Sequence, residues 1–311
     1  MADLIEIDPA RYSRSMTPRQ LNMYACVAIM WGSSFALLVP VVNSLGWAGG
    51  VSFRGFIASG IVFLVALATH RQLNFAGNWK HFAVLGATSV GMNLGGMNYA
   101  LSHIGTQLTA ILVTTIPLYS LVIESIWTKK KPTLQKTAGL IIGFSGVVIL
   151  IGLSPQAVNR EFWFGVFGSF IASFGFALGG NYSRAKAGHI GSWEQTIGTF
   201  LFGGLWTLPL LLVVPIIRTP TIGDILCLFA VAATASSLAY ILYFKLVAEV
   251  GATTALTTEY LVPVVAVILG YFLFSESLSA TQIFGSLVIM LGCALVMGFN
   301  PFTRKKDVVK Q

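Results

Sequence analysis

Two stretches of this 311-residue chain decide its fold: residues 105–117, GTQLTAILVTTIP, and residues 251–263, GATTALTTEYLVP. Each begins with glycine and ends with proline, and the second follows the first at an offset of 146 residues. The same offset holds without a gap over a longer segment, so that residues 79–152 align with residues 225–298. Self-similarity at a fixed offset indicates a duplicated unit. The chain is therefore predicted to consist of two related halves.

The residue types that coincide make the duplication convincing. The further coincidences are Gly139 with Gly285, Gly146 with Gly292, Gly152 with Gly298, and Ala87-Thr88 with Ala233-Thr234. Two apolar helices agree at some positions by chance. Glycines and a proline shared at one constant offset are much harder to obtain in that way. A linker at residues 153–161 separates the halves.

The composition indicates a membrane protein. Hydrophobic residues make up 55% of the chain and charged residues 10%, with a mean hydropathy of +0.79. A soluble domain carries about 25% charged residues, so the composition argues against the ordinary classes of soluble enzyme. No GxxxxGK[ST], HExxH or GxSxG motif occurs, and no cofactor, metal site or catalytic residue is predicted. An ATP-driven pump would need a motor on another chain.

The apolar residues fall into ten runs, each close to the roughly 20 residues that span a bilayer core. The runs are residues 22–42, 47–69, 80–101, 105–127, 134–153, 162–183, 193–215, 222–245, 252–274 and 279–299. Each half has five, an odd number, so the halves enter the membrane from opposite sides. We therefore predict an all-α polytopic membrane protein with ten transmembrane helices, built as two inverted five-helix repeats at residues 22–152 and 162–299. Inverted repeats are typical of secondary transporters.

The charge distribution predicts the orientation. With the N-terminus in the cytosol, 16 of the 19 Lys and Arg residues fall on the cytosolic side, Arg160 and Arg218 on the far side, and Arg54 within a helix. Basic residues favour cytosolic loops. The tails at residues 1–21 and 300–311 are thus expected in the cytosol, at a bacterial-type inner membrane. The net charge of +8 marks topology, and no nucleic-acid partner is expected.

Several local patterns resemble the drug/metabolite transporter superfamily, in its ten-helix EamA-like branch. Residues 31–35, WGSSF, are similar to the WGxxF opening of that branch, and Arg54 lies in a similar Arg-containing second helix. The later pattern of Pro, Glu, Gly and Gly is matched by Pro263, Glu276, Gly285 and Gly292. The resemblance covers about residues 22–299. It implies a metabolite transporter, commonly an exporter of amino acids or similar compounds, without selecting one substrate.

Two departures from the family pattern bear on the site. The family often has an acidic residue directly before the second-half proline, where this chain has Val262 and carries Glu259 one turn earlier. The first-half turn, residues 129–132, lacks the acidic residue that Glu276 supplies in the second half. A site role for Glu259 therefore does not follow from the motif.

Arg54 and Glu259 fall within apolar runs, where ionisable groups are costly and each is a functional candidate. Arg54 can bind a substrate carboxylate or phosphate through its planar fork; the structural alternative is pairing with helix carbonyls. Glu259 can accept a substrate ammonium or carry a coupling proton; the alternative is a buried glutamate bonded to neighbouring hydroxyls. Their different depths argue against a direct ion pair.

Matching prolines and a set of polar side chains complete the predicted site. Pro117 and Pro263 should each remove a backbone hydrogen bond at corresponding points, which predicts a helix break or hinge on a central pathway. The predicted lining of the central substrate cavity is Trp31, Asn98, Thr114, Tyr240, Tyr243 and Glu259. Small and hydroxyl residues also pack membrane helices, so a structural role is the alternative.

These features predict a secondary active or facilitative transporter that moves small metabolites, amino acids first, by alternating access; the resemblance favours export. The expected partners are a small-molecule substrate, the lipid bilayer and a proton as candidate coupling ion. Multidrug or hydrophobic-amine efflux is one alternative. A polytopic enzyme acting on a lipid-linked substrate is the other. The substrate, the direction, the coupling ion and the choice between monomer and homodimer stay open.

Overall fold

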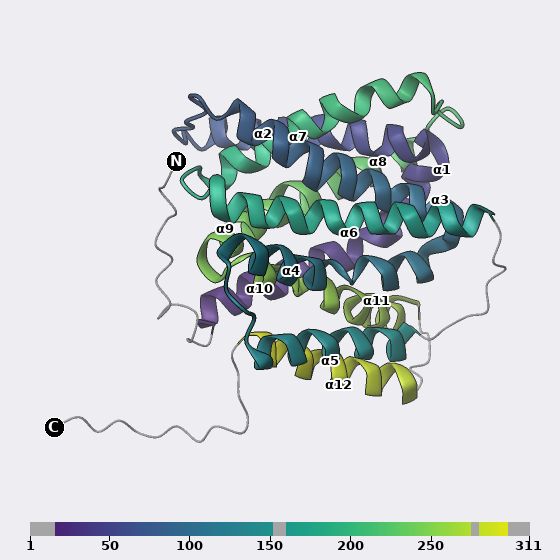
Figure 1. Cartoon of the computed structure of the whole chain (residues 1–311). Helices are drawn as coiled ribbons and strands as arrows, with labels where there is room; N and C mark the ends of the chain where they lie inside the picture. The colour runs from purple at the N-terminus through teal and green to yellow at the C-terminus, as the bar shows by residue number, and fades with distance from the viewer. Residues whose placement is uncertain (1–15, 152–159, 275–279, 298–311) are drawn as a thin grey trace.

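The computed structural model describes residues 16–151, 160–274 and 280–297, and every regular element within these ranges is helical (Figure 1). The elements, with three helical turns of 3₁₀ or π type labelled η, are α1 Pro18–Ala68, α2 Trp79–Leu85, η2 Gly86–Met92, α3 Asn93–Val113, α4 Ile116–Thr128, α5 Leu134–Ile151, α6 Arg160–Lys186, α7 Ser192–Thr207, η3 Leu208–Leu212, α8 Ile222–Val231, η4 Ala232–Leu238, α9 Ala239–Val250, α10 Ala252–Leu256, α11 Thr258–Phe274 and α12 Ala280–Val296. Four stretches are long and apolar enough to cross a membrane: Ala36–Ala68, Arg160–Lys186, Ser192–Leu212 and Ile222–Val250.

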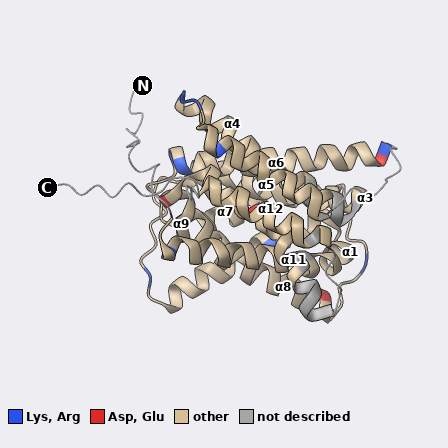
Figure 2. Ribbon diagram, turned by 90° about the horizontal axis from the view of Figure 1, so that it is seen from below, with Lys and Arg blue, Asp and Glu red and all other residues tan. Residues whose placement is uncertain are grey.

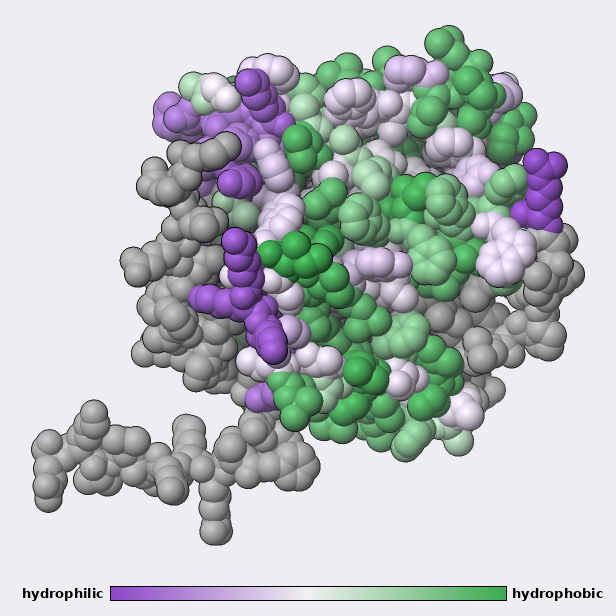
Figure 3. All heavy atoms as spheres, viewed as in Figure 1, coloured by the Kyte–Doolittle hydropathy of each residue, from purple (hydrophilic) through white to green (hydrophobic). Residues whose placement is uncertain are grey.

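The surface has the polarity of a membrane protein. Charged residues gather mainly at the two ends of the helices (Figure 2), and apolar side chains cover much of the surface between them (Figure 3). We call the two ends the Gly46 end, where α6 begins, and the Lys129 end, where α4 finishes. An apolar belt between two polar ends matches the hydrocarbon core of a bilayer.

The longest element, α1, contains the first two predicted runs, which meet at Gly46. This glycine has φ 72° and ψ 169°, a conformation that it adopts readily because it has no Cβ. A Cβ there would lie 3.3 Å from the carbonyl oxygen of Pro215. Nearby, the backbone N–H groups of Ile217 and Arg218 donate to the carbonyl oxygen of Ser44. The turn is thus held against the loop that follows η3.

Two π-helical turns occupy equivalent places in the two halves. The turns η2 and η4 are separated by the same 146-residue offset as the sequence repeat. The helices α5 and α12 likewise begin at equivalent residues, Leu134 and Ala280. The duplication in the sequence therefore reappears in the backbone, as expected for two repeated five-helix halves.

The two halves differ where the third predicted run of each half meets the fourth. In the second half, Gly251 has φ 89° and separates α9 from α10. In the first half, helical hydrogen bonding in α3 continues to Val113, across the boundary predicted between residues 101 and 105. A change from apolar to polar residues marks where a run ends. It does not mark where helical hydrogen bonding ends.

Helix interruptions lie near the two prolines, but the prolines are not equivalent. The first-half interruption is at Thr114 and Thr115, so that Pro117 occupies the first turn of α4. The second-half interruption is at Thr257, and Pro263 lies inside α11. A proline in a first turn removes no intrahelical hydrogen bond, whereas Pro263 removes one. The sequence predicted that each proline removes a backbone hydrogen bond, and this applies to Pro263 alone. That either proline acts as a hinge stays a prediction.

The helices α5 and α12 pack with their backbones in contact (Figure 1). A Cβ at Gly146 would lie 2.7 Å from a backbone nitrogen of α12, and a Cβ at Gly285 would lie 2.6 Å from a backbone nitrogen of α5. A Cβ at Gly292 would lie 2.7 Å from the carbonyl oxygen of Gly139. Small residues that allow such approach are typical of helix contacts in membranes. These glycines are the ones that coincide in the sequence repeat.

Gly285→Ala is expected to lower the free energy of unfolding by about 1–3 kcal/mol, the usual cost of extra volume in a tight contact. The added methyl group would meet backbone atoms of α5, which cannot rotate away as a side chain can. Thermal unfolding of the purified protein in detergent measures the change. Gly60→Ala is the matched control, since a Cβ there meets no atom within 4 Å. Equal unfolding temperatures for the two variants would contradict this description of the contact.

Candidate functional site

Six aromatic side chains form a buried cluster between the two halves. Trp31 comes from α1, and the other five come from α6, α7 and α9. The members of this aromatic cluster, each at most 7% exposed, are Trp31, Phe176, Phe200, Tyr240, Tyr243 and Phe244. The ring centre of Tyr243 lies 5.5 Å from that of Trp31 and 5.1 Å from that of Phe176. The first half thus contributes one ring to a cluster built mainly by the second.

The two π-helical turns hold the aromatic cluster through reciprocal hydrogen bonds. The indole N–H of Trp31 donates to the carbonyl oxygen of Ala235 in η4 at 3.0 Å. The phenol of Tyr240 donates to the carbonyl oxygen of Ser89 in η2 at 3.2 Å. π-Helical turns depart from the α-helical bonding pattern and are frequent at functional sites. Each half thus supplies an acceptor for an aromatic donor of the other half.

Trp31→Phe is expected to lower the free energy of unfolding by about 1–3 kcal/mol, because the buried carbonyl of Ala235 loses its hydrogen-bond partner. Phenylalanine keeps an aromatic ring at this site but a smaller one, so some packing is lost together with the N–H group. Thermal unfolding in detergent measures the effect, with Trp79→Phe as control at a site that is 59% exposed. A Trp31→Phe protein as stable as the control would show that the bond contributes nothing.

Arg54 lies beside the aromatic cluster with part of its guanidinium unpaired. Its Nε donates to the hydroxyl of Ser236, in η4, at 2.5 Å, and the residue is 2% exposed. Within the described ranges, no carboxylate pairs with Arg54 and its Nη1 has no hydrogen-bond partner. The contact with helix carbonyls that was considered from the sequence is not made by any described residue. A buried guanidinium with an unused donor can bind an anionic group.

Glu259 lies in the first turn of α11, next to the interruption at Thr257, and is partly exposed. Neither an ion pair nor a hydrogen bond joins its carboxylate to another residue of the described segments. Neighbouring hydroxyls bond elsewhere, since Thr258 donates to a carbonyl of α10 and Tyr240 donates to η2. The Glu259 carboxylate interacts electrostatically with the phenols of Tyr240 and Tyr243. Arg54 also interacts electrostatically with Tyr240, with the opposite sign, so this phenol lies within reach of both charges.

The structure divides the residues that were predicted to line one cavity. Three of the six belong to the aromatic cluster, and Glu259 lies beside it. Asn98 lies toward the Gly46 end, where its amide nitrogen donates to the carbonyl oxygen of Trp47 at 3.4 Å. Its amide oxygen has no partner among the described residues. Thr114 is buried at the interruption that follows α3.

The sequence reasoning did not identify Ser89 and Phe176 as residues around the cluster. Ser89 acts through η2, and the coinciding Ala87-Thr88 and Ala233-Thr234 pairs fall inside η2 and η4 without specifying that these turns are π-helical. Phe176 carried no signal, since it is one of 22 phenylalanines in the chain. Aromatic packing across the halves could not be recognised from composition alone.

A second set of polar residues, which we call the Ser120 network, joins the halves toward the Lys129 end. The hydroxyl of Ser120 (α4) lies 2.9 Å from that of Thr253 (α10) and accepts from the amide of Asn181 (α6) at 2.8 Å. Thr253 also donates to the carboxylate of Glu124, and the Nζ of Lys136 (α5) pairs with that carboxylate at 3.0 Å. Because α4 and α5 belong to one half and α6 and α10 to the other, separation of the halves at this end must break the network.

Ten helices in two inverted repeats, with a buried arginine and buried aromatic rings between the halves, are the architecture of a membrane transporter. The EamA-like transporter family matches residues 21–152 and 163–298, one match for each half. The chain belongs to this family. It is therefore an integral membrane transporter and not an enzyme.

Two of the three curated relatives described next are named as transporters. YoaV of Bacillus subtilis (strain 168), described as an uncharacterized transporter, is 19% identical over 283 residues, or 90% of this chain and 96% of that protein. PecM of Dickeya dadantii (strain 3937) is 25% identical over 74% of this chain and 77% of its own. YedA of Escherichia coli (strain K12), an uncharacterized inner membrane transporter, is 25% identical over 86% of this chain and 87% of its own. One crystal structure shares the fold, with a TM-score of 0.75, 14% identity, and coverage of 91% of this chain and 99% of the other.

Proposed function

We propose that the transporter carries small metabolites with both a carboxylate and an ammonium group, amino acids first. The observation that supports this substrate class is the pair of unpaired opposite charges, Arg54 and Glu259, at the aromatic cluster. Arg54 would bind the carboxylate through its free donor. Glu259 would accept the ammonium, and the rings would contact the apolar part of the substrate. An amphiphilic zwitterion uses all three features.

We infer that transport proceeds by alternating access between the two repeats. The Ser120 network would close the Lys129 end, because it links the halves there. The interruptions at Thr114–Thr115 and Thr257, with Pro117 and Pro263 nearby, would allow the fourth helix of each half to bend. The energy would come from the gradient of the substrate or from protons carried by Glu259.

We further propose that both termini lie in the cytosol, at a bacterial-type inner membrane, and that the direction is export. The placing of 16 of the 19 basic residues supports this orientation. The name of YedA supports the inner membrane. In this scheme, residues 1–21 and 300–311 are cytosolic tails, and residues 22–152 and 162–299 are the two repeats. The Lys129 end then faces the cytosol.

A second candidate is efflux of hydrophobic amines, and the aromatic cluster is the observation that favours it. Six rings beside an unpaired carboxylate suit an organic cation, which gains cation–π contacts with the rings and charge pairing with Glu259. Arg54 argues against this candidate. A buried cation next to the same rings would repel such a substrate.

Counterflow in proteoliposomes tests the proposed substrate class. Vesicles preloaded with one unlabelled solute receive a trace of the same labelled solute, and the panel covers amino acids, sugars, nucleosides and cationic drugs. We expect amino acids to exchange faster than in protein-free vesicles. Exchange of cationic drugs without exchange of amino acids would favour the second candidate, and exchange of sugars alone would contradict both.

A further inference from the structure

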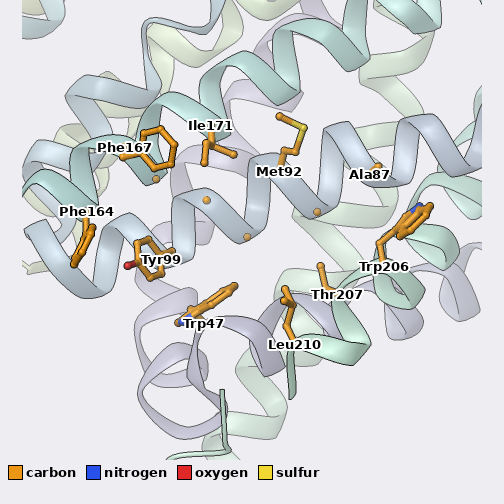
Figure 4. A pocket seen from close by; sticks show the side chains of 14 residues that line it. Trp47, Ala87, Met92, Tyr99, Phe164, Phe167, Ile171, Trp206, Thr207 and Leu210 are labelled. Carbon is orange, nitrogen blue, oxygen red and sulfur yellow. The ribbon is translucent and has the colours of Figure 1, made fainter. Parts of the chain in front are cut away.

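A groove of about 610 Å³ lies between α3, α6 and α7, away from the aromatic cluster (Figure 4). Its floor is made of glycines, Gly91 in η2 and Gly95 and Gly96 in α3. Phe167 of α6 stands on one side of the floor, and Trp206 of α7 stands on the other. The groove thus runs along a strip of bare backbone between raised aromatic side chains.

The groove is open to the apolar surface and is itself apolar. Its rim is exposed, with Phe167 at 64% and Trp206 at 57%. The polar side chain that its lining takes from α7 is already engaged, because the hydroxyl of Thr207 bonds to the carbonyl of Gly203 and to the hydroxyl of Ser52. The indole N–H of Trp206 likewise donates to a carbonyl of α2 at 3.0 Å. A polar solute would therefore find few hydrogen-bond partners here, whereas a hydrocarbon chain would find an apolar surface to contact.

Open space lies directly over the floor of the groove. Gly95 is buried, yet a Cβ built on it meets no atom within 4 Å. Empty space therefore lies over this residue, beside the exposed rings of Phe167 and Trp206. A transmembrane helix, about 10–12 Å across with its side chains, needs more room than the 610 Å³ of the groove. A single hydrocarbon chain can reach the floor.

One end of the groove carries the guanidinium of Arg160, with the carboxylate of Glu161 beside it in the first turn of α6 and 3.3 Å from the Nε2 of His103. Phe164 lines the groove, and the guanidinium of Arg160 lies 5.2 Å from the centre of its ring. Arg160 is exposed at the start of α6. At the same end Tyr99 lines the groove and stacks on His103 at 4.1 Å between ring centres. Aromatic and basic residues of this kind are typical of the membrane–water interface.

We propose that this groove binds one glycerophospholipid, with an acyl chain along the glycine floor and the phosphate on Arg160. The apolar lining matches the chain, and the guanidinium matches the phosphate oxygens. With both termini in the cytosol, the Gly46 end faces outward and the lipid belongs to the outer leaflet of the inner membrane. The site is separate from the aromatic cluster and does not depend on which substrate is carried.

Native mass spectrometry of the purified protein, titrated with dioleoyl phosphatidylglycerol, tests the proposal. Gly95→Phe fills the groove, and Gly60→Phe is the matched control because a Cβ at either glycine meets open space. We expect the wild type and Gly60→Phe to retain one tightly bound phospholipid. Gly95→Phe should bind the phospholipid at least about tenfold more weakly, because its ring displaces methylene groups of the acyl chain from the groove. Gly95→Leu provides the same test with a smaller side chain should the Phe variant fold poorly.

Arg160→Gln tests the headgroup contact. It should weaken the same phospholipid, while a detergent with the same hydrocarbon chain and an uncharged head binds wild type and variant alike. Equal phospholipid retention in all variants would overturn the proposal. So would a change from dimer to monomer on Gly95→Phe with retention unchanged, which would indicate a second copy of the chain in the groove. A changed transport rate with unchanged lipid retention would indicate substrate there and would also overturn it.

Discussion

Arg54→Gln is expected to lower the transport efficiency for amino acids by about 10- to 100-fold, which corresponds to the roughly 1.5–3 kcal/mol of a hydrogen bond to a charged group. Arg54 is buried beside the aromatic cluster, and its Nη1 has no partner among the described residues. A substrate carboxylate would take up that donor. The initial rate of labelled amino acid counterflow in proteoliposomes measures the loss.

Two variants separate substrate binding by Arg54 from a structural role. Arg54→Lys should restore little transport, because an ammonium offers a point charge where the guanidinium offers a fixed fork. Ser236→Ala leaves the charge and removes the acceptor of the Nε hydrogen bond, so it should cost less than Arg54→Gln. A primary amine without a carboxylate provides the comparison substrate. If Arg54→Gln slows both substrates equally, or lowers the unfolding temperature as much as it lowers transport, Arg54 is structural.

Glu259→Gln is expected to abolish the response of transport to a proton gradient. If one proton enters for each zwitterion that leaves, every unit of pH difference should raise the accumulation ratio about tenfold in the wild type, since one unit corresponds to about 1.4 kcal/mol. The amide of glutamine cannot exchange a proton in this range, so the variant should show no such dependence. Proteoliposomes with an imposed pH difference measure both ratios. The compartment that receives the substrate must be the acidic one, because protons move in the opposite direction to the substrate.

Glu249→Gln is the matched control for this prediction. Glu249 is an exposed carboxylate near the end of α9, hydrogen-bonded to Gln20, and its loss should leave the pH response intact. A Glu259→Gln protein that keeps the pH dependence of the wild type would exclude Glu259 as the coupling group. Loss of amine transport in the same variant, with the pH response unchanged, would assign Glu259 to ammonium binding alone.

The architecture could be predicted from the sequence because it depends on patterns that extend over many residues. Glycine and proline repeated at a constant offset signalled the duplication, and five apolar runs in each half required the inversion. The structure then shows why the glycines recur. Gly139 and Gly146 of α5 and their equivalents Gly285 and Gly292 of α12 are points where the two backbones touch, so any side chain would separate the helices.

The site was predicted less completely than the fold. Arg54 and Glu259 could be singled out, since charges within apolar runs are conspicuous. The contacts between halves could not, because they depend on backbone geometry. The π-helical turns η2 and η4 present carbonyls to Trp31 and Tyr240, and no residue pattern specifies a π turn in advance. Asn98 looked equivalent to the phenols but contacts the turn at the Gly46 end instead.

Glu124 shows how helix packing decides which charges pair. In the sequence it is close to the lysines at residues 129–131. The structure pairs it with Lys136 of α5 and with the hydroxyl of Thr253 of α10. Neighbours in sequence are not neighbours in space where a helix turns away. The consequence is functional, since Glu124 becomes part of the Ser120 network between the halves.

Alternating access is tested most directly by locking the Lys129 end. The hydroxyls of Ser120 and Thr253 lie 2.9 Å apart, so Ser120→Cys/Thr253→Cys places two thiols side by side on opposite halves. The native cysteines at positions 26, 227 and 293 are first replaced by alanine. Oxidation should stop amino acid counterflow, reduction should restore it, and each single-cysteine variant should be insensitive to both treatments. Counterflow at the full rate through the oxidised, cross-linked protein would contradict alternating access at this end.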